Sequence, residues 1–208
     1  MPKKFEKEFI SYCENQNLEV NPNQIKVIKK LEDYHNINYK SFLSKLFSKQ
    51  KTKKGFYLYG GVGVGKTMIL NFFYDHLEEK KLKKHFNEFM LGFHDFVHEQ
   101  KEKNEENVIN QFVKNLKSKA SLVYFDEFQV TNIVDAMILG KLFEQIFKED
   151  IKIILTSNTK ISELYKEGLQ REQFIPFIKI MEDQSIEYEL KIEDDYRKSN
   201  DNQKQRYF

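Results

Sequence analysis

The sequence predicts an α/β fold in which a mostly parallel, five-stranded sheet is covered by helices on both faces. Three observations support this expectation. From residue 55 onward, short apolar runs of strand length alternate with stretches that have helical periodicity. The length of 208 residues suits one domain with an extension. The 19 Phe and 11 Tyr residues supply a core, which excludes a wholly disordered chain.

Composition and charge exclude several other classes of protein. The 34 basic and 32 acidic side chains give a net charge of +2, which disfavours a dedicated nucleic-acid binder. Cys13 is the only cysteine, so no internal disulfide can form. No apolar run approaches the ~20 residues of a membrane helix, and the charged start lacks the apolar core of a signal peptide. We therefore expect a cytoplasmic protein without stable membrane insertion.

Residues 1–54 are expected to form an N-terminal helical extension that ends in a basic linker. Asn21 and Pro22 match a helix start, with Asn21 as the cap and Gln24 at the third position after it. The run Lys-Gln-Lys-Thr-Lys-Lys at 49–54 is typical of a solvated loop. Contact with nucleic acid or an anionic partner is the alternative interpretation of this run.

Residues 55–193 are expected to form the core, followed by a polar tail at 194–208 that frays. The predicted strands cover residues 56–59, 85–90, 122–125, 151–156 and 186–192. The predicted helices cover residues 68–77, 93–99, 133–147, 161–167 and 172–181. The charged stretch 99–107 is expected to be an exposed helix end or loop.

The most informative stretch follows the first predicted strand. Residues 60–67 read Gly-Gly-Val-Gly-Val-Gly-Lys-Thr and fit the phosphate-loop pattern G-x-x-x-x-G-K-[ST]. Glycines let backbone N–H groups curl around phosphates, and the next helix adds unpaired N–H groups and the positive end of its dipole. Lys66 is expected to reach the β- and γ-phosphates, and Thr67 to be a Mg²⁺ ligand. The residues expected at the nucleotide are Gly60, Gly61, Val62, Gly63, Val64, Gly65, Lys66, Thr67 and Met68.

Two acidic residues follow the apolar strand at 122–125. Asp126 is expected to hold Mg²⁺ through its water shell, since Mg²⁺ gives up water reluctantly. Glu127 is expected to orient and deprotonate an attacking water. An acidic turn without a catalytic role is the alternative, and the phosphate loop upstream disfavours it.

Three further side chains are weaker candidates. Asn158, after the strand at 151–156, has an amide suited to holding the attacking water, although Asn also favours turns and helix caps. Asn87 could hydrogen-bond Glu127 and hold it idle. Arg171, between two predicted helices, could project into a neighbouring subunit's nucleotide site, and a surface ion pair is the alternative.

Several longer stretches resemble the ZapE/AFG-type AAA+ ATPases, a family with a bacterial cell-division ATPase and mitochondrial relatives. The resemblance covers residues 18–197 and extends well beyond the phosphate loop. It rests on His-Phe-Asn-Glu-Phe-Met at 85–90, Phe-Asp-Glu-Phe-Gln-Val-Thr at 125–131, Asp-Ala-Met at 135–137, Thr-Ser-Asn at 156–158, and Leu-Tyr followed by Gly-Leu-Gln-Arg at 164–171. A generic phosphate-loop protein would lack most of these stretches.

The resemblance implies an AAA+ module that hydrolyses ATP with Mg²⁺ and assembles into a ring or partial ring. It makes Asn158 the first sensor and Arg171 a finger that acts in trans. It also implies a protein partner, in the division machinery for the bacterial members and in protein quality control for the mitochondrial ones.

Three features depart from the family pattern. Asn87 replaces a usual histidine, and Asn132 replaces an aspartate. Family members also continue past residue 197 into a C-terminal helical region, whereas this chain stops at Phe208. We expect weaker nucleotide closure and weaker ring formation without that region.

The leading interpretation is an AAA+ ATPase that couples Mg-dependent ATP hydrolysis to remodelling of a protein partner, and that forms a homo-oligomer. One alternative is a helicase-loader-like protein acting on nucleic-acid complexes, with the basic runs 49–54 and 80–84 as its footprint, although nucleic acid is not the expected partner. Another is a nucleotide-binding module with little turnover. A nucleoside-type phosphotransferase is disfavoured because no Arg-rich lid for a second phosphorylated substrate is evident.

Overall fold

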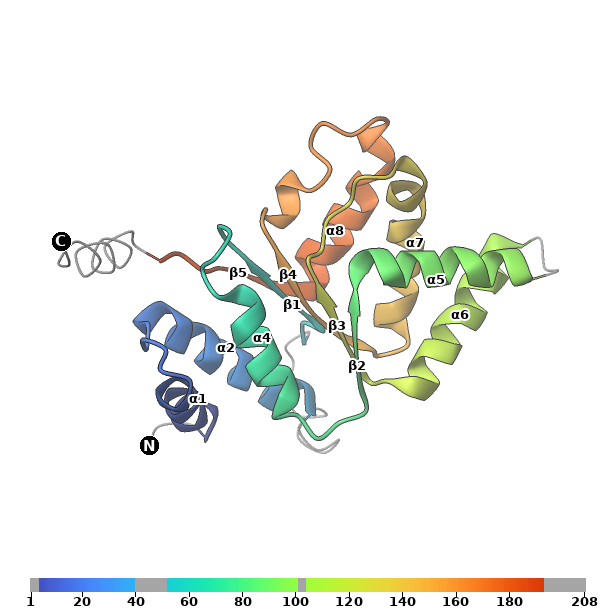
Figure 1. The fold of residues 1–208 in the computed structure, drawn as a ribbon. Coiled ribbons are helices and arrows are strands. Elements are labelled where there is room, and N and C mark those ends of the chain that lie inside the picture. The colour runs from blue at the N-terminus through green and yellow to red at the C-terminus, as the bar shows by residue number, and fades with distance from the viewer. Residues whose placement is uncertain (1–3, 40–51, 101–103, 193–208) are drawn as a thin grey trace, which may run out of the picture.

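The centre of the protein is a parallel sheet, seen in a computed structural model that describes residues 4–39, 52–100 and 104–192. Figure 1 shows its five strands in the spatial order β2-β3-β4-β1-β5. All four neighbouring pairs run parallel, which confirms the predicted sheet. The strands are β1 (Gly55–Tyr59), β2 (Lys81–His85), β3 (Leu122–Asp126), β4 (Lys152–Ser157) and β5 (Ser185–Glu189).

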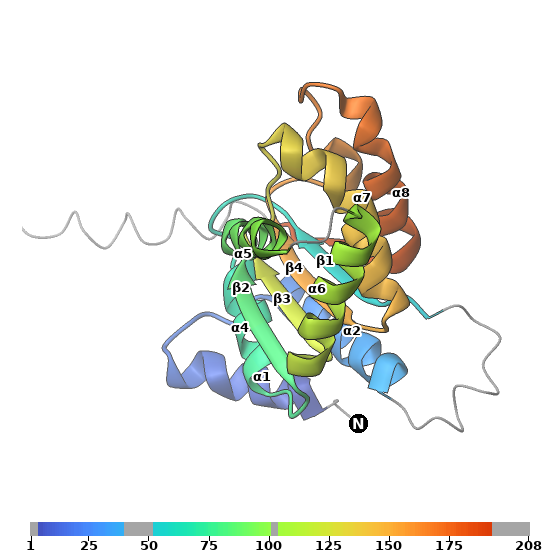
Figure 2. The same cartoon turned by 90° about the vertical axis from the view of Figure 1, so that its right-hand side faces the viewer.

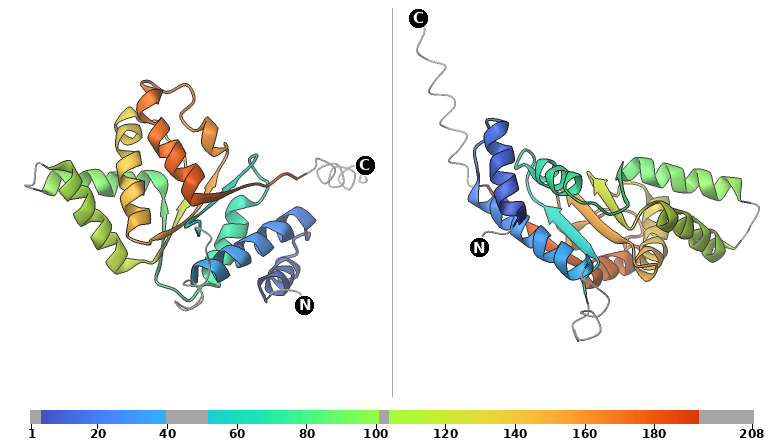
Figure 3. Two further views of the ribbon diagram at one scale, coloured as in Figure 1. Left: turned by 180° about the vertical axis from the view of Figure 1, so that it is seen from behind. Right: turned by 90° about the horizontal axis from the view of Figure 1, so that it is seen from below.

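Helices cover both faces of this sheet, as Figures 2 and 3 show. One face carries α1 (Lys4–Asn15), α2 (Pro22–Tyr39) and α4 (Lys66–Asp75). The other carries α5 (Phe86–Glu99), α6 (Glu105–Lys119), α7 (Ile133–Lys148) and α8 (Ile175–Gln184). Two short 3₁₀ turns, η1 (Ile161–Glu163) and η2 (Arg171–Gln173), lie between β4 and α8.

Alternating side chains of the central strands supply the two cores. In β1, Phe56 and Leu58 pack with α1, α2 and α4, whereas Tyr57 packs with α7 and α8. In β3, Tyr124 and Phe125 divide between the two faces in the same way. Strands covered on both faces carry apolar side chains in both directions, so they appear in the sequence as continuous apolar runs.

The N-terminal extension is largely helical where it is described. Asn21 caps α2, because its Oδ1 accepts the backbone N–H of Asn23 at 2.8 Å. Gln24 does not complete a capping box; its amide points instead to the phosphate loop. Residues 40–51, with half of the basic run at 49–54, and the predicted tail at 194–208 lie outside the described residues.

The second predicted strand, at 85–90, was wrong. The strand is β2, and α5 begins directly after it at Phe86. Residues 86, 89, 90 and 93 are buried at helical spacing, so their pattern belongs to α5. The strand itself is lysine-rich because it lies at the edge of the sheet, where charged side chains are favoured.

Three other elements of the structure differ from the prediction. Helix α6 was missed, although Asn104 caps it by accepting the backbone N–H of Glu106 at 3.0 Å. The predicted helix at 161–167 is only the turn η1, and Tyr165 in this segment has a φ of 53° that a helix does not allow. Helix α8 begins three residues later than predicted and has a proline in its first turn, as helix starts often do.

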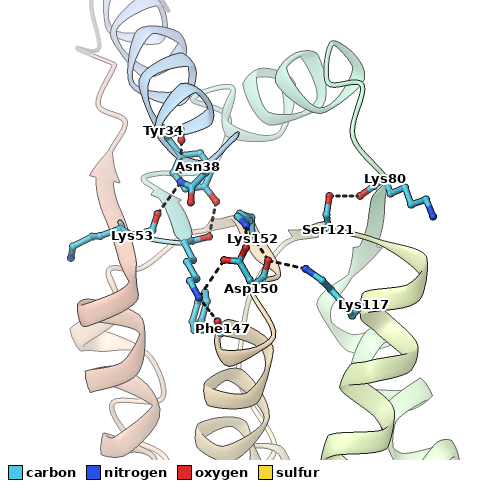
Figure 4. A network of polar contacts seen from close by, with 10 residues as sticks. Tyr34, Asn38, Lys53, Lys80, Lys117, Ser121, Phe147, Asp150 and Lys152 are labelled. Atoms are coloured by element: carbon cyan, nitrogen blue, oxygen red, sulfur yellow. Dashed lines mark hydrogen bonds and ion pairs between the residues drawn. The ribbon is translucent and has the colours of Figure 1, made fainter. Parts of the chain in front are cut away.

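A polar network at the amino ends of the strands ties α2 to the sheet (Figure 4). The buried Lys152 ammonium lies 2.6 Å from Asp150 Oδ2, and the Lys54 ammonium lies 3.3 Å from Asp150 Oδ1. The Tyr34 hydroxyl donates to the Lys54 carbonyl at 2.6 Å. Partial burial opposes ionisation of Asp150, but the two ammonium groups outweigh it and hold the pKa of its carboxyl below the ordinary value.

None of the helices in the described ranges is both long and apolar enough to cross a membrane.

Candidate functional site

A cleft of about 580 Å³ lies at the carboxyl ends of β1, β3 and β4. Ligands of open α/β sheets bind at this end of the strands. Its walls come from the loop between β1 and α4, which can be followed in Figure 1, and from the residues after β3 and β4. The residues that line it are Val62, Gly63, Gly65, Lys66, Thr67, Met68, Glu127, Phe128, Gln129, Thr156, Ser157, Asn158 and Thr159.

Two glycines fix the path of the loop. Gly65 has a φ of 91° and is the N-cap of α4. A Cβ at Gly60, whose φ is 152°, would lie 2.3 Å from the carbonyl oxygen of Leu190. Side chains larger than hydrogen are therefore strained at both positions. The loop delivers the chain into the amino end of α4, where unpaired N–H groups and the helix dipole favour an anion.

Lys66 lies at the start of α4 and is only 8% exposed. Its ammonium donates to the carbonyl oxygens of Gly60 at 2.9 Å and Gly61 at 2.8 Å, and to Asn158 Oδ1 at 3.0 Å. Burial lowers the pKa of Lys66, and the Asp126 carboxylate partly opposes that shift. The ammonium is thus held by neutral oxygens, which are weaker partners than a phosphate would be.

Asp126, at the end of β3, accepts two hydroxyl hydrogen bonds through the same oxygen. Its Oδ1 accepts from Thr67 Oγ1 at 3.0 Å and from Thr156 Oγ1 at 2.6 Å, and the residue is 5% exposed. A hydroxyl and a carboxylate are hard oxygen donors of the kind Mg²⁺ prefers. The described residues contain no group of three or more His, Cys, Asp or Glu that could hold a metal. Mg²⁺ is commonly held by one or two carboxylates while it keeps water and phosphate ligands, and the Thr67–Asp126 pair fits that donor set.

Glu127 directly follows β3 and lines the cleft with an exposed side chain. Its φ is 56°, and its backbone N–H donates to Thr156 Oγ1 at 3.0 Å. A left-handed conformation costs a non-glycine residue about 1 kcal/mol or more, and such strain is often found at functional sites. The end of β4 supports the turn, because Phe128 N–H donates to the Thr156 carbonyl at 2.7 Å.

The structure brings five of the predicted side chains into one cleft: Lys66, Thr67, Glu127 and Asn158 line it, and Asp126 lies beside Thr67. Arg171 does not line this cleft, and its Nη2 donates to the Ser162 carbonyl at 2.8 Å. Asn87 is exposed on the first turn of α5. Asn87 and Glu127 are both described residues, and no hydrogen bond joins them.

Two side chains at the site were not singled out from the sequence. Thr156 bonds both Asp126 and the Glu127 backbone, and its place at the end of a strand next to the acid pair could have indicated it. Gln24 reaches the Val64 carbonyl from the N-terminal extension, and nothing in the local sequence indicates that contact.

Comparison with known structures supports this fold. The fold is similar to the crystal structure of the DnaC helicase loader, with a TM-score of 0.55 and 12% identity, covering 83% of this chain and 92% of that chain. This likeness shows the fold, a five-stranded parallel sheet between layers of helices.

Two curated relatives are more similar in sequence. Lactation elevated protein 1 homolog B of Danio rerio is 40% identical over 146 residues, which cover 65% of this chain and 29% of the relative. Cell division protein ZapE of Escherichia coli K12 is 37% identical over 142 residues, which cover 65% of this chain and 37% of the relative. The chain thus spans well under half the length of these relatives.

The sequence model of the AFG1-like ATPases matches residues 12–208, which is nearly the whole chain. The chain therefore belongs to the AFG1-like ATPase family.

Proposed function

We propose that the protein binds ATP with Mg²⁺ in this cleft and hydrolyses it. The observation that carries the proposal is the position of the Lys66 ammonium, which is held between the phosphate-loop carbonyls and Asn158. The Thr67–Asp126 pair lies beside it, and the Glu127 side chain lines the same space. A phosphate-binding loop, oxygen donors for a metal and a carboxylate for water activation are the groups that phosphoryl transfer to water needs.

Binding depends on the loop and on Lys66. Residues 60–68 provide the backbone N–H groups and the helix start that surround the phosphates. On binding, Lys66 exchanges its contacts with carbonyl oxygens for contacts with the anionic β- and γ-phosphates. Thr67 and Asp126 would hold Mg²⁺, which on binding neutralises charge on the phosphates. Thr156 keeps the Asp126 carboxylate oriented toward Thr67.

Hydrolysis depends on Glu127 and Asn158. The Glu127 carboxylate accepts a proton from water while the water oxygen bonds to the γ-phosphorus. The bond from the γ-phosphorus to the bridging oxygen breaks, and ADP leaves. The Asn158 amide, which already bonds Lys66, holds the γ-phosphate and water in line.

Arg171 suits a role at the cleft of another copy of the chain. Its guanidinium does not line its own cleft, and its Nε is buried without a hydrogen-bond partner among the described residues. An arginine supplied by a neighbour would stabilise the charge of the transition state. We therefore assign a homo-oligomer in which the core at 55–193 provides both cleft and finger.

The partner is proposed to be a protein. The ZapE relative is a cell division protein, and cell division is the process we assign to this chain on that similarity. Three lysines of the alternative nucleic-acid footprint are engaged within the protein. Lys81 donates to the Leu77 carbonyl at 2.6 Å, Lys83 to Asn71 Oδ1 at 2.6 Å, and Lys53 to the Glu182 carbonyl at 2.7 Å. This makes a nucleic-acid partner the weaker assignment.

The test is ATP binding and ATP turnover of the full chain and of Glu127→Gln. We expect the variant to bind ATP as the parent does and to hydrolyse it at least about a hundredfold more slowly, because it lacks the general base. Glu144→Gln on α7 makes the same change away from the cleft and should leave both properties unchanged. Unchanged turnover in Glu127→Gln would overturn the assignment of the base. ATP binding without turnover in the parent would favour the nucleotide-binding module.

A further inference from the structure

A buried amide of the N-terminal helix α2 contacts the phosphate loop. Gln24 is 7% exposed, and its Nε2 donates to the backbone carbonyl of Val64 at 3.1 Å. Only the NH₂ end of a glutamine amide can bond to a carbonyl, so the orientation of this side chain is fixed. The bond joins the extension to the loop across 40 residues of sequence.

Other contacts hold the amino end of α2 in the same place. Asn21 caps the helix, and Asn23 Nδ2 donates to the carbonyl of Lys191, just after β5, at 2.9 Å. Farther along α2, Val27 and Leu31 are fully buried in the core shared with α4. These contacts fix the position of α2, and α2 therefore holds Gln24 next to the loop.

The geometry of one peptide group connects Gln24 to the cleft. The Val64 carbonyl and the Gly65 N–H belong to the same planar trans peptide, so the two groups point in opposite directions. Gly65 lines the cleft, whereas neither Gln24 nor Val64 does. A carbonyl held toward Gln24 turns the Gly65 N–H toward the space where a phosphate would lie.

The fit around this contact leaves little freedom. A Cβ at Gly65 would lie 2.7 Å from Gln24 Nε2. Gln24 Oε1 is buried and has no hydrogen-bond partner among the described residues. An unpaired buried acceptor costs free energy, and such groups are often retained for a role other than stability.

We propose that Gln24 is a positioning residue, which holds the Val64 carbonyl and thereby presets the phosphate loop for a nucleoside triphosphate. In this way the packing of α2 against the core sets the affinity of the cleft for ATP. The inference rests on the proposed binding of ATP in the cleft.

The test replaces Gln24 by a side chain of the same shape whose donor depends on pH. In Gln24→Glu, a protonated carboxyl can donate to the Val64 carbonyl, whereas an ionised one cannot and is repelled by it. We expect ATP to bind at least about tenfold more weakly than to the parent at pH 8. At pH 5.5 it should bind within about threefold of the parent, because position 24 is buried and burial raises the pKa of the introduced carboxyl. Gln24→Met, which has no donor, should bind about fivefold more weakly at both pH values.

Calorimetric titration with ATP and Mg²⁺ gives these affinities, and turnover at saturating ATP should stay within about twofold of the parent because only the loop is affected. Gln16→Glu makes the same charge change at an exposed position after α1 and should behave as the parent. Equal affinity in all Gln24 variants, or a loss in Gln24→Glu that does not change with pH, would overturn the inference. Failure of the parent itself to bind ATP would instead overturn the proposed function.

Discussion

Thr156 and Asp126 join the ends of two neighbouring strands through a hydrogen bond of 2.6 Å from Thr156 Oγ1 to Asp126 Oδ1. The same hydroxyl accepts the backbone N–H of Glu127 at 3.0 Å. One side chain thus fixes both the carboxylate that we assign to the metal and the turn that presents the general base.

Thr156→Val tests this arrangement. Loss of the hydroxyl leaves the Glu127 N–H without its acceptor and removes one donor from Asp126. The free energy of unfolding should therefore be about 1–3 kcal/mol lower than in the parent. Turnover should fall about tenfold through misplacement of Glu127. Urea unfolding and steady-state ATPase rates measure the two effects. Thr131→Val, at an exposed loop position, is the matched control, and equal behaviour of the two variants would contradict the role of Thr156.

Lys66→Met should weaken ATP binding without lowering the stability of the fold. Hydrogen bonds to charged groups contribute about 1.5–3 kcal/mol, so ATP affinity should fall roughly tenfold to 150-fold. Burial lowers the pKa of Lys66, which means that folding disfavours its charged form. The resulting loss of stability is fully present at neutral pH. It disappears only as the pH rises from the lowered pKa of the folded state to the pKa of the unfolded state. Without nucleotide, Lys66→Met should therefore unfold at a urea concentration no lower than the parent does.

Asp150→Asn should change the acid sensitivity of the fold. The Lys152 and Lys54 ammonium groups lower the pKa of Asp150, so its stabilisation is present above the unfolded pKa and is lost as pH falls through the lowered folded pKa. We expect the variant to be about 1 kcal/mol less stable at pH 7, a modest value because Asp150 is half-exposed. The two unfolding curves should converge at acid pH. Asp75→Asn, at the exposed last residue of α4, should show no such convergence, and a constant difference for Asp150→Asn would argue against the ion pairs.

Mixing two inactive variants tests whether Arg171 acts at a neighbour's cleft. Arg171→Ala should lower turnover by roughly a thousandfold, as loss of an arginine finger does. Glu127→Gln keeps its arginine, so mixed assemblies contain clefts with an intact Glu127 faced by an intact Arg171. ATPase activity should reappear when the variants are mixed at high protein concentration. Lys179→Ala, exposed on α8, should stay active alone, and no recovery at any mixing ratio would contradict action in trans.

The parts predicted from the sequence are those whose signal is local. The phosphate loop was predicted with its flanking strand and helix because its glycines, lysine and threonine are contiguous. Strand β3 was predicted because both of its faces are buried, which makes residues 122–125 a continuous apolar run. The edge strand β2 has no such run. Its Leu82 is the one aliphatic residue among lysines and a histidine, so the neighbouring aromatic pattern of α5 was taken for the strand.

The parts that were missed depend on contacts between distant segments. Helix α6 buries only four residues, Val108, Ile109, Val113 and Leu116, and the rest of it is polar enough to suggest a loop. The role of Gln24 depends on a bond to Val64 that exists only once α2 has docked. Asn158 and Lys66 were each named from the sequence, whereas the 3.0 Å bond between them follows from the parallel pairing of β1 with β4.

The N-terminal helices form one layer of the fold together with α4. Phe9 and Leu31 are fully buried, and they pack in the same cluster as Phe56 and Leu58 of β1. A protein cut at Gly55 would keep every proposed catalytic residue and still expose this apolar face of its sheet to water. Exposed apolar surface of this kind favours self-association, so such a fragment should aggregate rather than act as a minimal enzyme. The smallest unit that can fold and also carry the site therefore includes α1 and α2.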